Sequence, residues 1–312
     1  MRDKFLVMSD FDIGIDIGGT YIKGVLIQGA SVVRQAVRKT NPKEANWQEG
    51  VRLIINELAK EVSDPIDNIG LSIPGLCDEH NRMISYMPVR FDGLEGFNWT
   101  RFLKREVHVI NDGHAALWAE SQWGVGKGIK NIAMLTLGTG VGGGLLLDGE
   151  IYQGFLQRAG HLGHIVVDGN SQSQDITGMA GSLEEAVGEY SLNERSKGQF
   201  KTYFDLLQSY QDGHQIASDI WLETVRKLAL GISSLCNAFS PQLVILSGGL
   251  IKAGEQLLEP LSNFMDRYEW RPGGSITPIR LAKFQDYPGA IGAALFARSR
   301  SSIHNENEKI TT

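Results

Sequence analysis

The chain has 312 residues, with 30 Lys+Arg against 36 Asp+Glu and a formal net charge of −6. Its 42% hydrophobic and 21% charged residues are typical of a globular protein and exclude wholesale disorder. The mild acidity argues against a dedicated nucleic-acid binder, and no run of about 18 apolar residues is present that could span a membrane.

Cysteine usage and the start of the chain favour a cytoplasmic protein. Cys77 and Cys236 are too few for a disulfide framework or a four-thiolate zinc site, and they suit a reducing compartment. Residues 1–10 lack the apolar core and the small-residue cleavage site of a secretory signal. Residues 306–312 are polar, and we expect them to form a tail.

The first half of the chain begins with a predicted strand, glycine turn and second strand over residues 11–27. Ile13, Ile15 and Ile17 alternate with small or polar residues, which is the period-two pattern of a strand. Apolar spacing and turn residues then predict, in chain order, a helix at 47–61, a strand at 69–75, a helix at 97–105, a strand at 107–112 and a helix at 115–123.

The second half repeats the opening pattern, with a strand, a glycine turn and a strand over residues 132–149. The turns Gly18-Gly19-Thr20 and Gly138-Thr139-Gly140 occupy corresponding positions, which indicates a weak internal duplication and two related α/β halves with a cleft between them. We predict a small lobe of residues 1–112 plus 287–305 and a large lobe of residues 113–286. Further elements are predicted as helices at 183–190, 203–210, 215–240 and 289–298, and as a strand at 241–249.

The second glycine turn formally contains G-x-G-x-x-G at Gly138, Gly140 and Gly143. A dinucleotide fingerprint needs a helix after the glycines, but a strand follows here, so we reject that interpretation. A hairpin turn of glycine and threonine can instead bind phosphate oxygens through backbone N–H groups and a hydroxyl. A side chain at Gly140 would then occupy the space of the phosphate. The alternative is a tight hairpin with no ligand.

Two aspartates stand at predicted strand ends. Asp16, just before the first turn, could hold a hydrated Mg²⁺ ion. Asp112 could accept the hydroxyl proton in a phosphoryl transfer to an alcohol. It could equally be the N-cap of the following helix, and spacing alone does not decide between these roles.

Six ordered segments together resemble the signatures of the ROK family, which comprises bacterial sugar kinases and related repressors. They are Asp16-Ile-Gly-Gly-Thr-Tyr-Ile-Lys23, Ser72-Ile-Pro-Gly75, Asn111-Asp112, Thr136-Leu-Gly-Thr-Gly-Val-Gly-Gly-Gly144, Gly160-His-Leu-Gly-His164 and Ser247-Gly-Gly249. The resemblance covers about residues 11–298. It implies a two-domain α/β fold of the actin-like ATPase (ribonuclease H-like) type with an interdomain cleft.

The resemblance also implies a function in carbohydrate metabolism. We expect an ATP- and Mg²⁺-dependent kinase for the 6-hydroxyl of a hexose or N-acetylhexosamine, acting as a homodimer. The residues implied to bind ATP are Asp16, Gly18, Gly19, Thr20, Lys23, Gly138, Thr139, Gly140, Gly142, Gly248 and Gly249. The residues implied to bind the sugar are Pro74, Gly75, Asn111, Asp112, His161, His164 and Glu184, with Asp112 as the catalytic base.

The sequence departs from the family at its zinc element, C-x-C-G-x-x-G-C-x-E. The three thiolates are replaced by Asp175, Thr177 and Ser182, while both glycines and Glu184 remain. Hard oxygen ligands do not replace thiolates at a structural zinc site. We therefore expect no zinc, and we expect packing to hold this loop.

The sugar side departs further. The usual E-x-G-H has His161 in place of its carboxylate, as in bacterial N-acetylmannosamine kinases. His114 replaces the second Asn of N-D-A-N, and the usual asparagine near Met87-Pro88 is hard to find. Two alternatives to a kinase are a repressor and an inactive relative. A sugar-sensing repressor needs a helix-turn-helix domain, for which only about ten residues precede the first motif. A catalytically inactive sugar-binding or regulatory ROK protein is opposed by the intact Asp16 and Asp112.

Overall fold

The computed structural model describes residues 11–40, 47–87 and 91–310, and the chain divides into two compact units. Unit 1 comprises Met1–Lys127, Gln153–Arg158 and Phe284–Thr312; unit 2 comprises Gly128–Tyr152 and Ala159–Lys283. The predicted boundary at residue 112 differs from this division, because helix α3 (Asp112–Trp123) packs along helix α9 (Pro288–Ile310) within unit 1. The expectations for residues 1–10 and for Pro88 lie outside the described residues.

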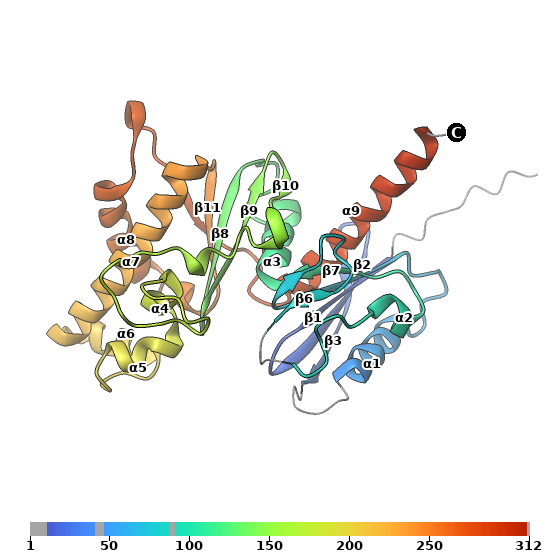
Figure 1. Ribbon diagram of the computed structural model, residues 1–312, viewed down its shortest axis with the longest axis horizontal. Helices are drawn as coiled ribbons and strands as arrows, with labels where there is room; N and C mark the ends of the chain where they lie inside the picture. The colour runs from blue at the N-terminus through green and yellow to red at the C-terminus, as the bar shows by residue number, and fades with distance from the viewer. Residues whose placement is uncertain (1–10, 41–46, 88–90, 311–312) are drawn as a thin grey trace, which may run out of the picture. The chain divides into compact units, whose positions relative to one another are not determined.

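Each unit contains a five-stranded sheet, and the two sheets have the same topology (Figure 1). In the spatial order of each sheet, the first three strands are antiparallel neighbours joined by hairpins. The fourth strand is parallel to the third, and the fifth is parallel to the fourth. The order in unit 1 is β3 (Ser31–Lys39), β2 (Tyr21–Gln28), β1 (Phe11–Ile17), β4 (Asn68–Ile73) and β7 (His108–Asn111). The order in unit 2 is β10 (Glu150–Ile151), β9 (Val141–Leu147), β8 (Ile132–Leu137), β11 (Leu243–Ser247) and β12 (Ile279–Leu281). The predicted internal duplication is confirmed at the level of topology.

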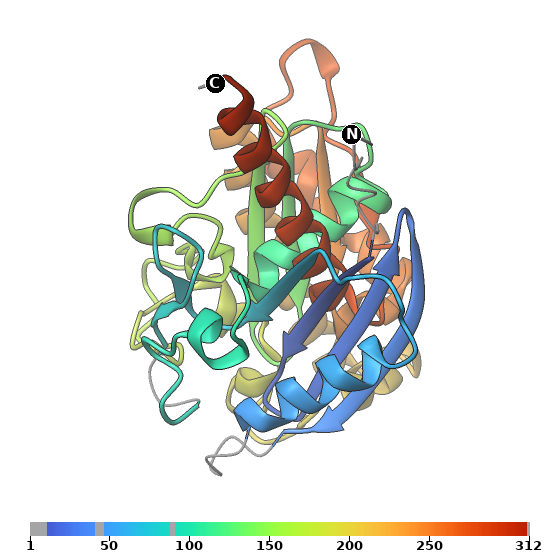
Figure 2. The same cartoon turned by 90° about the vertical axis from the view of Figure 1, so that its right-hand side faces the viewer.

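In unit 1, helices cover both faces of the sheet (Figure 2). Ile13, Ile15 and Ile17 are fully buried in a core that includes helix α1 (Trp47–Ala59). Between them, Gly14 faces α9, and a Cβ at this position would collide with a backbone carbonyl of that helix. The remaining elements of this unit are α2 (Trp99–Leu103), the small hairpin β5 (Leu76–Cys77) and β6 (Ile84–Tyr86), and the 3₁₀ helix η1 (Phe155–Gln157).

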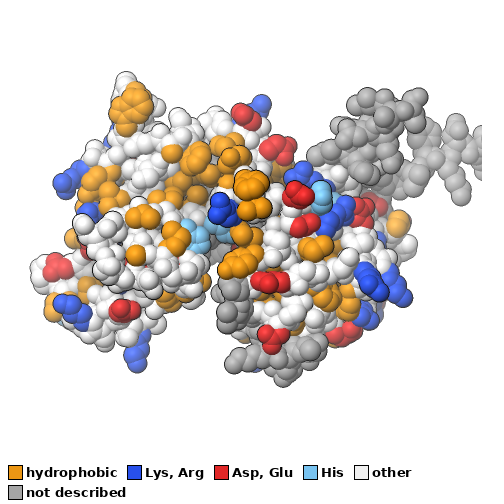
Figure 3. All heavy atoms as spheres, in the orientation of Figure 1, with side chains coloured by type: hydrophobic (Ala, Val, Ile, Leu, Met, Phe, Trp, Pro, Cys, Tyr) orange, Lys and Arg blue, Asp and Glu red, His pale blue; other side chains and the backbone are white. Residues whose placement is uncertain are grey.

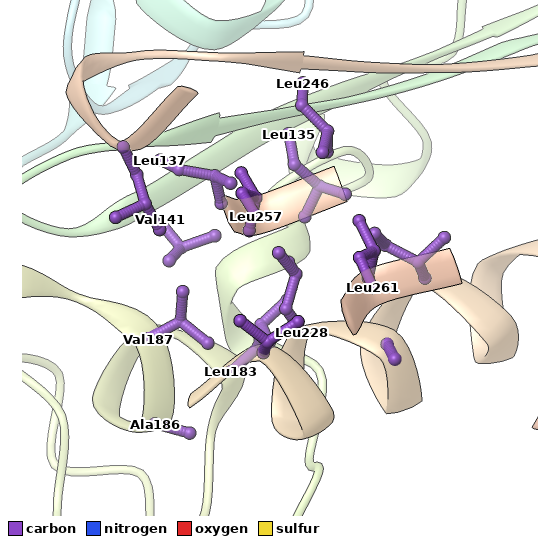
Figure 4. Packing of buried hydrophobic residues seen from close by; sticks show 14 of the residues in the cluster. Leu135, Leu137, Val141, Leu183, Ala186, Val187, Leu228, Leu246, Leu257 and Leu261 are labelled. Atoms are coloured by element: carbon purple, nitrogen blue, oxygen red, sulfur yellow. The ribbon is translucent and has the colours of Figure 1, made fainter. Parts of the chain in front are cut away.

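In unit 2, leucines of strands β8 and β11 pack against helices in a fully buried core (Figure 4). Figure 4 shows Leu135 and Leu246 near Leu261, which lies on helix α8. The helices are α4 (Leu183–Val187), α5 (Glu189–Arg195), α6 (Tyr203–Gln211), α7 (Gln215–Phe239) and α8 (Glu255–Tyr268). The 3₁₀ helices are η2 (Leu162–His164), η3 (Gly249–Ala253) and η4 (Pro272–Gly274).

The helices of the structure differ from the sequence predictions in three places. The helix predicted at 183–190 is two short helices, because Gly188 has an extended backbone (φ −64°, ψ 142°) between them. Helix α8, which contains Pro260, was not predicted. The predicted tail from residue 306 is helical as far as Ile310, the end of α9, and its last two residues lie outside the described chain.

The surface charge and the helix hydropathy of the described residues agree with what the composition predicts. Acidic and basic side chains are interspersed on the face drawn in Figure 3. Among the described helices, none is long and apolar enough to cross a membrane.

Candidate functional site

The carboxyl edge of the unit 1 sheet gathers the predicted residues of that unit. Strands β1, β4 and β7 are parallel neighbours, with Asp16 opposite Ser72 and Ile73 opposite Asn111. Their carboxyl ends therefore lie at one edge, the place where α/β sheets bind ligands. The predicted residues in or just after these strands are Asp16, Gly18, Gly19, Thr20, Pro74, Gly75, Asn111 and Asp112.

Asp16 is held at this edge by two neighbours. The Ser72 hydroxyl donates a hydrogen bond to Asp16 Oδ1 at 2.6 Å. At the start of α9, a Cβ on Gly289 would lie 2.6 Å from the same oxygen, so the helix packs directly on the carboxylate. The pKa of Asp16 is raised to about 6, chiefly by burial and in part by the Asp112 carboxylate, against the lowering effects of the Ser72 hydrogen bond and the Lys23 charge. Asp16 and Asp112 are thus electrostatically coupled.

Asn111, and not Asp112, caps helix α3. Asn111 Oδ1 accepts hydrogen bonds from the Gly113 N–H (2.9 Å) and the His114 N–H (3.3 Å), which is the N-cap arrangement. Asn111 Nδ2 donates to the Gly75 carbonyl at 3.1 Å, so two predicted sugar residues are in contact. Asp112 is the first helical residue, and its side chain is exposed. Its carboxylate is therefore available to a ligand.

Lys23 lies on strand β2, opposite Asp16 in the β1–β2 hairpin. Its Nζ lies 5.3 Å from the centroid of the Tyr287 ring, a cation–π contact. Tyr287 has a left-handed backbone (φ 60°) immediately before α9. The sequence did not single out Tyr287 or Ser72 as partners of the predicted site residues, although Ser72 opens one of the quoted motifs.

The carboxyl edge of the unit 2 sheet brings its two glycine turns together. Strands β8 and β11 are parallel, with Thr136 opposite Ser247. Gly138 follows the first strand, and Gly248 follows the second. Gly248 has φ 91°, and a Cβ there would collide with the carbonyl of Leu137, so this close approach requires glycine.

A cavity of about 370 Å³ opens beside these turns in unit 2. This volume falls within the range of small-molecule sites. A Cβ built on Gly138 or Gly249 would have no atom within 4 Å, so a ligand could approach the backbone of both turns. The cavity lining includes Gly138, Glu189, Phe204, Gln208, Gly249 and Lys252.

The second glycine turn of the sequence, Gly138-Thr139-Gly140, is held in place by hydrogen bonds from neighbouring segments. Two backbone amides at the start of α5 donate to it, from Glu189 to the Gly138 carbonyl (3.1 Å) and from Tyr190 to the Thr139 carbonyl (3.0 Å). Glu184 Oε2 accepts a hydrogen bond from the N–H of Val141, which follows the turn, at 3.1 Å. These bonds fix the backbone of the turn to helices α4 and α5.

Gly140 differs from our expectation. We predicted that a side chain there would occupy the space of a phosphate. The structure instead shows that a Cβ on Gly140 would lie 2.8 Å from Glu184 Oε2, and one on Gly142 would lie 2.6 Å from Thr136 Oγ1. Both glycines therefore face the protein, whereas Gly138 faces the cavity.

The predicted histidines lie at η2, which packs against β9 and α4 in unit 2. His161 is the residue that precedes η2. The His164 ring lies beside the loop at residues 175–182, with its Nδ1 3.3 Å from Asp175 Oδ2. Glu184 lies in the first turn of α4 and reaches Val141, as described above. The partner of His164 was not predicted, because the two residues belong to separate segments.

The chain is similar to known proteins in sequence and in fold. The family model for the ROK family matches residues 12–300 of this chain. A glucokinase of Halalkalibacterium halodurans is 30% identical, over 96% of this chain and 99% of that protein. An N-acetyl-D-glucosamine kinase of Haemophilus influenzae is 25% identical, over 90% of this chain and 97% of that protein. The ROK hexokinase structure from Thermus thermophilus superposes with a TM-score of 0.84 at 27% identity, covering 94% of this chain and 99% of that one.

Proposed function

Because this chain belongs to the ROK family and has its actin-like ATPase fold, we propose that it is an ATP-dependent kinase for a sugar hydroxyl. The observation that carries the proposal is the unit 2 cavity beside Gly138 and Gly249. These are the turns that the sequence assigned to ATP, and their backbone is open to a ligand. A nucleotide bound there would have its phosphates close to the backbone of these turns.

The carboxyl edge of unit 1 supplies the acceptor chemistry in this proposal. The exposed Asp112 carboxylate accepts the proton of the sugar hydroxyl, while Asn111 and Gly75 contact other hydroxyls. In phosphoryl transfer most of the rate comes from positioning and charge stabilisation, so a single well-placed base suffices.

The acidic residues of unit 1 also fit a magnesium ion. Mg²⁺ in kinases is held by one or two carboxylates together with substrate phosphates, and it keeps several waters. Asp16 offers such a carboxylate beside the first glycine turn, and a built Cβ on Gly19 has no atom within 4 Å. When bound, the ion neutralises charge on the phosphoryl group. Asp16 would hold it through water.

The substrate in this proposal is a hexose or N-acetylhexosamine, phosphorylated at its 6-hydroxyl. The glucokinase and N-acetyl-D-glucosamine kinase among the relatives support this substrate class. We also propose that the protein acts as a cytoplasmic homodimer. An inactive regulatory protein is less favoured, because the exposed Asp112, the half-buried Asp16 and the open glycine turns are all present.

A coupled ADP-release assay tests the proposal. We expect ATP- and sugar-dependent ADP formation with at least one hexose, N-acetylhexosamine or related polyol. The Asp112→Asn variant should keep its fold and nucleotide binding but lose about 10²- to 10⁴-fold in turnover, because the change is nearly isosteric and removes the proton acceptor. If no sugar stimulated ADP formation, the inactive alternative would be supported. Unchanged kcat in Asp112→Asn would remove Asp112 from the role of base.

A further inference from the structure

The loop at residues 175–182 holds the positions where the family has its zinc thiolates. In this chain those positions are Asp175, Thr177 and Ser182. Between them, Gly178 (φ 85°) and Gly181 (φ 70°) adopt the left-handed backbone that favours glycine. The loop thus keeps the glycines of the element without its thiolates.

The Asp175 carboxylate collects hydrogen bonds from Thr177 and from the loop backbone. Asp175 Oδ1 accepts hydrogen bonds from the Thr177 hydroxyl (2.7 Å), the Thr177 N–H (2.8 Å) and the Met179 N–H (3.1 Å). The fully buried Ser182 side chain also acts to lower the pKa of the Asp175 carboxyl. Burial raises the pKa of Asp175, but these hydrogen bonds outweigh it, and the net pKa lies below the ordinary value. The carboxylate is therefore stabilised in its charged form.

A histidine from a separate segment completes the cluster. His164 Nδ1, at the end of η2, lies 3.3 Å from Asp175 Oδ2. The Asp175 side chain is fully buried, whereas that of His164 is 34% exposed. Two segments of unit 2 are thereby joined through one buried carboxylate. We call Asp175, Thr177, Ser182 and His164 the Asp175 cluster.

The Asp175 cluster does not fit zinc. Structural zinc sites use thiolate and imidazole ligands, and here one imidazole stands beside a carboxylate and two hydroxyls. The carboxylate oxygens already accept hydrogen bonds from their neighbours. In the described part of the chain, no group of three or more His, Cys, Asp or Glu side chains is placed to hold a metal ion. This chemistry disagrees with the metal that the family implies.

We propose that the Asp175 cluster takes the place of the zinc site and positions Glu184 against the second glycine turn. Ser182 is the N-cap of α4 and accepts a hydrogen bond from the Glu185 N–H at 3.1 Å. Helix α4 carries Glu184, whose Oε2 accepts from the N–H of Val141. Asp175 thus acts on the turn through His164 of η2, which packs against α4, as a positioning residue.

Two backbone bonds support this route. The Leu183 N–H donates to the Ile165 carbonyl at 2.7 Å, and the Val167 N–H donates to the Gly181 carbonyl at 2.9 Å. They join the residues on either side of Ser182, Gly181 and Leu183, to the segment that follows His164. The part of the proposal that concerns ATP rests on the proposed function; the part that concerns metal-free stability does not.

The experiment compares three variants with the wild type, each measured with and without EDTA. Asp175→Ala removes the acceptor, Thr177→Val removes one hydroxyl donor, and Ile176→Ala is the matched control, because Ile176 is 72% exposed in the same loop. Melting temperature, zinc content and the KM for ATP are measured for each protein. Zinc content is determined on protein prepared with zinc in the medium.

We expect about zero zinc per chain and no effect of EDTA. Asp175→Ala should lower the melting temperature by roughly 4–8 °C, because buried donors lose a charged acceptor. Below its melting temperature it should raise the KM for ATP about tenfold with a smaller change in kcat. Thr177→Val should give smaller shifts of the same sign, including when Asp175→Ala fails to fold. Ile176→Ala should match the wild type.

Three results would overturn the proposal. One is about one zinc per wild-type chain, with a melting temperature that falls in EDTA. Another is a wild-type melting temperature in both Asp175→Ala and Thr177→Val. The third is a lowered melting temperature in these variants with an unchanged KM for ATP, which would leave the cluster without a positioning role. If the wild type showed no kinase activity, the proposed function would fail, while melting temperature and zinc content would still test the cluster.

Discussion

Gly138 is the position at which the nucleotide site can be tested with the least effect on folding. Replacing it by alanine adds one methyl group to the turn after β8. The built Cβ has no protein atom within 4 Å, and Gly138 lines the unit 2 cavity. The backbone of Gly138 does not have a positive φ. Gly138→Ala should therefore leave stability unchanged or raise it by about 0.4–1 kcal/mol, because alanine restricts the unfolded chain.

The effect on ATP binding should be large. The methyl group fills space that a phosphate needs to reach the backbone, so one hydrogen bond to a charged group is lost. Such a bond contributes about 1.5–3 kcal/mol. Since about 1.4 kcal/mol corresponds to a tenfold change in affinity, the Kd for ATP should rise by roughly 10- to 150-fold.

Two further variants show whether the cavity is responsible. Gly169→Ala is the matched control, because a built Cβ there also has no atom within 4 Å and the residue lies outside the cavity lining. Gly140→Ala should behave in the opposite way, since its Cβ would lie 2.8 Å from Glu184 Oε2 and the strain falls on the fold. Titration calorimetry gives the Kd for ATP, and thermal melting gives stability.

The reasoning would be refuted by wild-type ATP affinity in Gly138→Ala, which would mean that this turn does not approach the phosphates. It would also fail if Gly140→Ala lost ATP affinity at unchanged stability. In that case our first expectation, that Gly140 faces the phosphate, would be right after all.

Three more predictions follow from single residues. The pKa of Asp16 is about 6 with the Ser72 hydrogen bond in place, and that bond lowers it. Ser72→Ala should therefore raise the pKa and move the acid limb of kcat/KM, where activity falls as Asp16 is protonated, to higher pH; an unmoved limb would show that Asp16 does not set it. His161→Glu should shift preference toward unsubstituted hexoses such as glucose, because a carboxylate accepts two or more hydroxyl hydrogen bonds where neutral imidazole accepts one; efficient wild-type use of glucose with no gain in the variant would contradict this. Neither thiol should react with an aromatic disulfide reagent in the native state, because burial raises the pKa of Cys77 to about 12 and also raises that of Cys236; rapid native-state labelling would show that the thiols are accessible.

Local patterns in the sequence were sufficient for the frame of the fold. The alternation of Ile13, Ile15 and Ile17 predicted strand β1, and the repeated glycine turns predicted two related halves, which the shared sheet topology confirms. Period-two burial and turn chemistry act over a few residues, so they are visible in a single chain. Helix α8 was missed because Pro260 interrupts its pattern and tertiary packing of Leu257 and Leu261 outweighs the proline.

The roles of individual site residues were decided only by the tertiary structure. Sequence spacing left Asp112 as base or cap, and the contact of Asn111 with the α3 amides resolved the cap. It could not distinguish Gly138 from Gly140, because the difference lies in which one faces Glu184, a residue far along the chain. We expected packing to hold the 175–182 loop, and the structure shows in addition the hydrogen bonds of Asp175, which spacing could not predict for the same reason. Hydrogen bonds and steric contacts between distant segments depend on positions in space, which residue types and spacings do not specify.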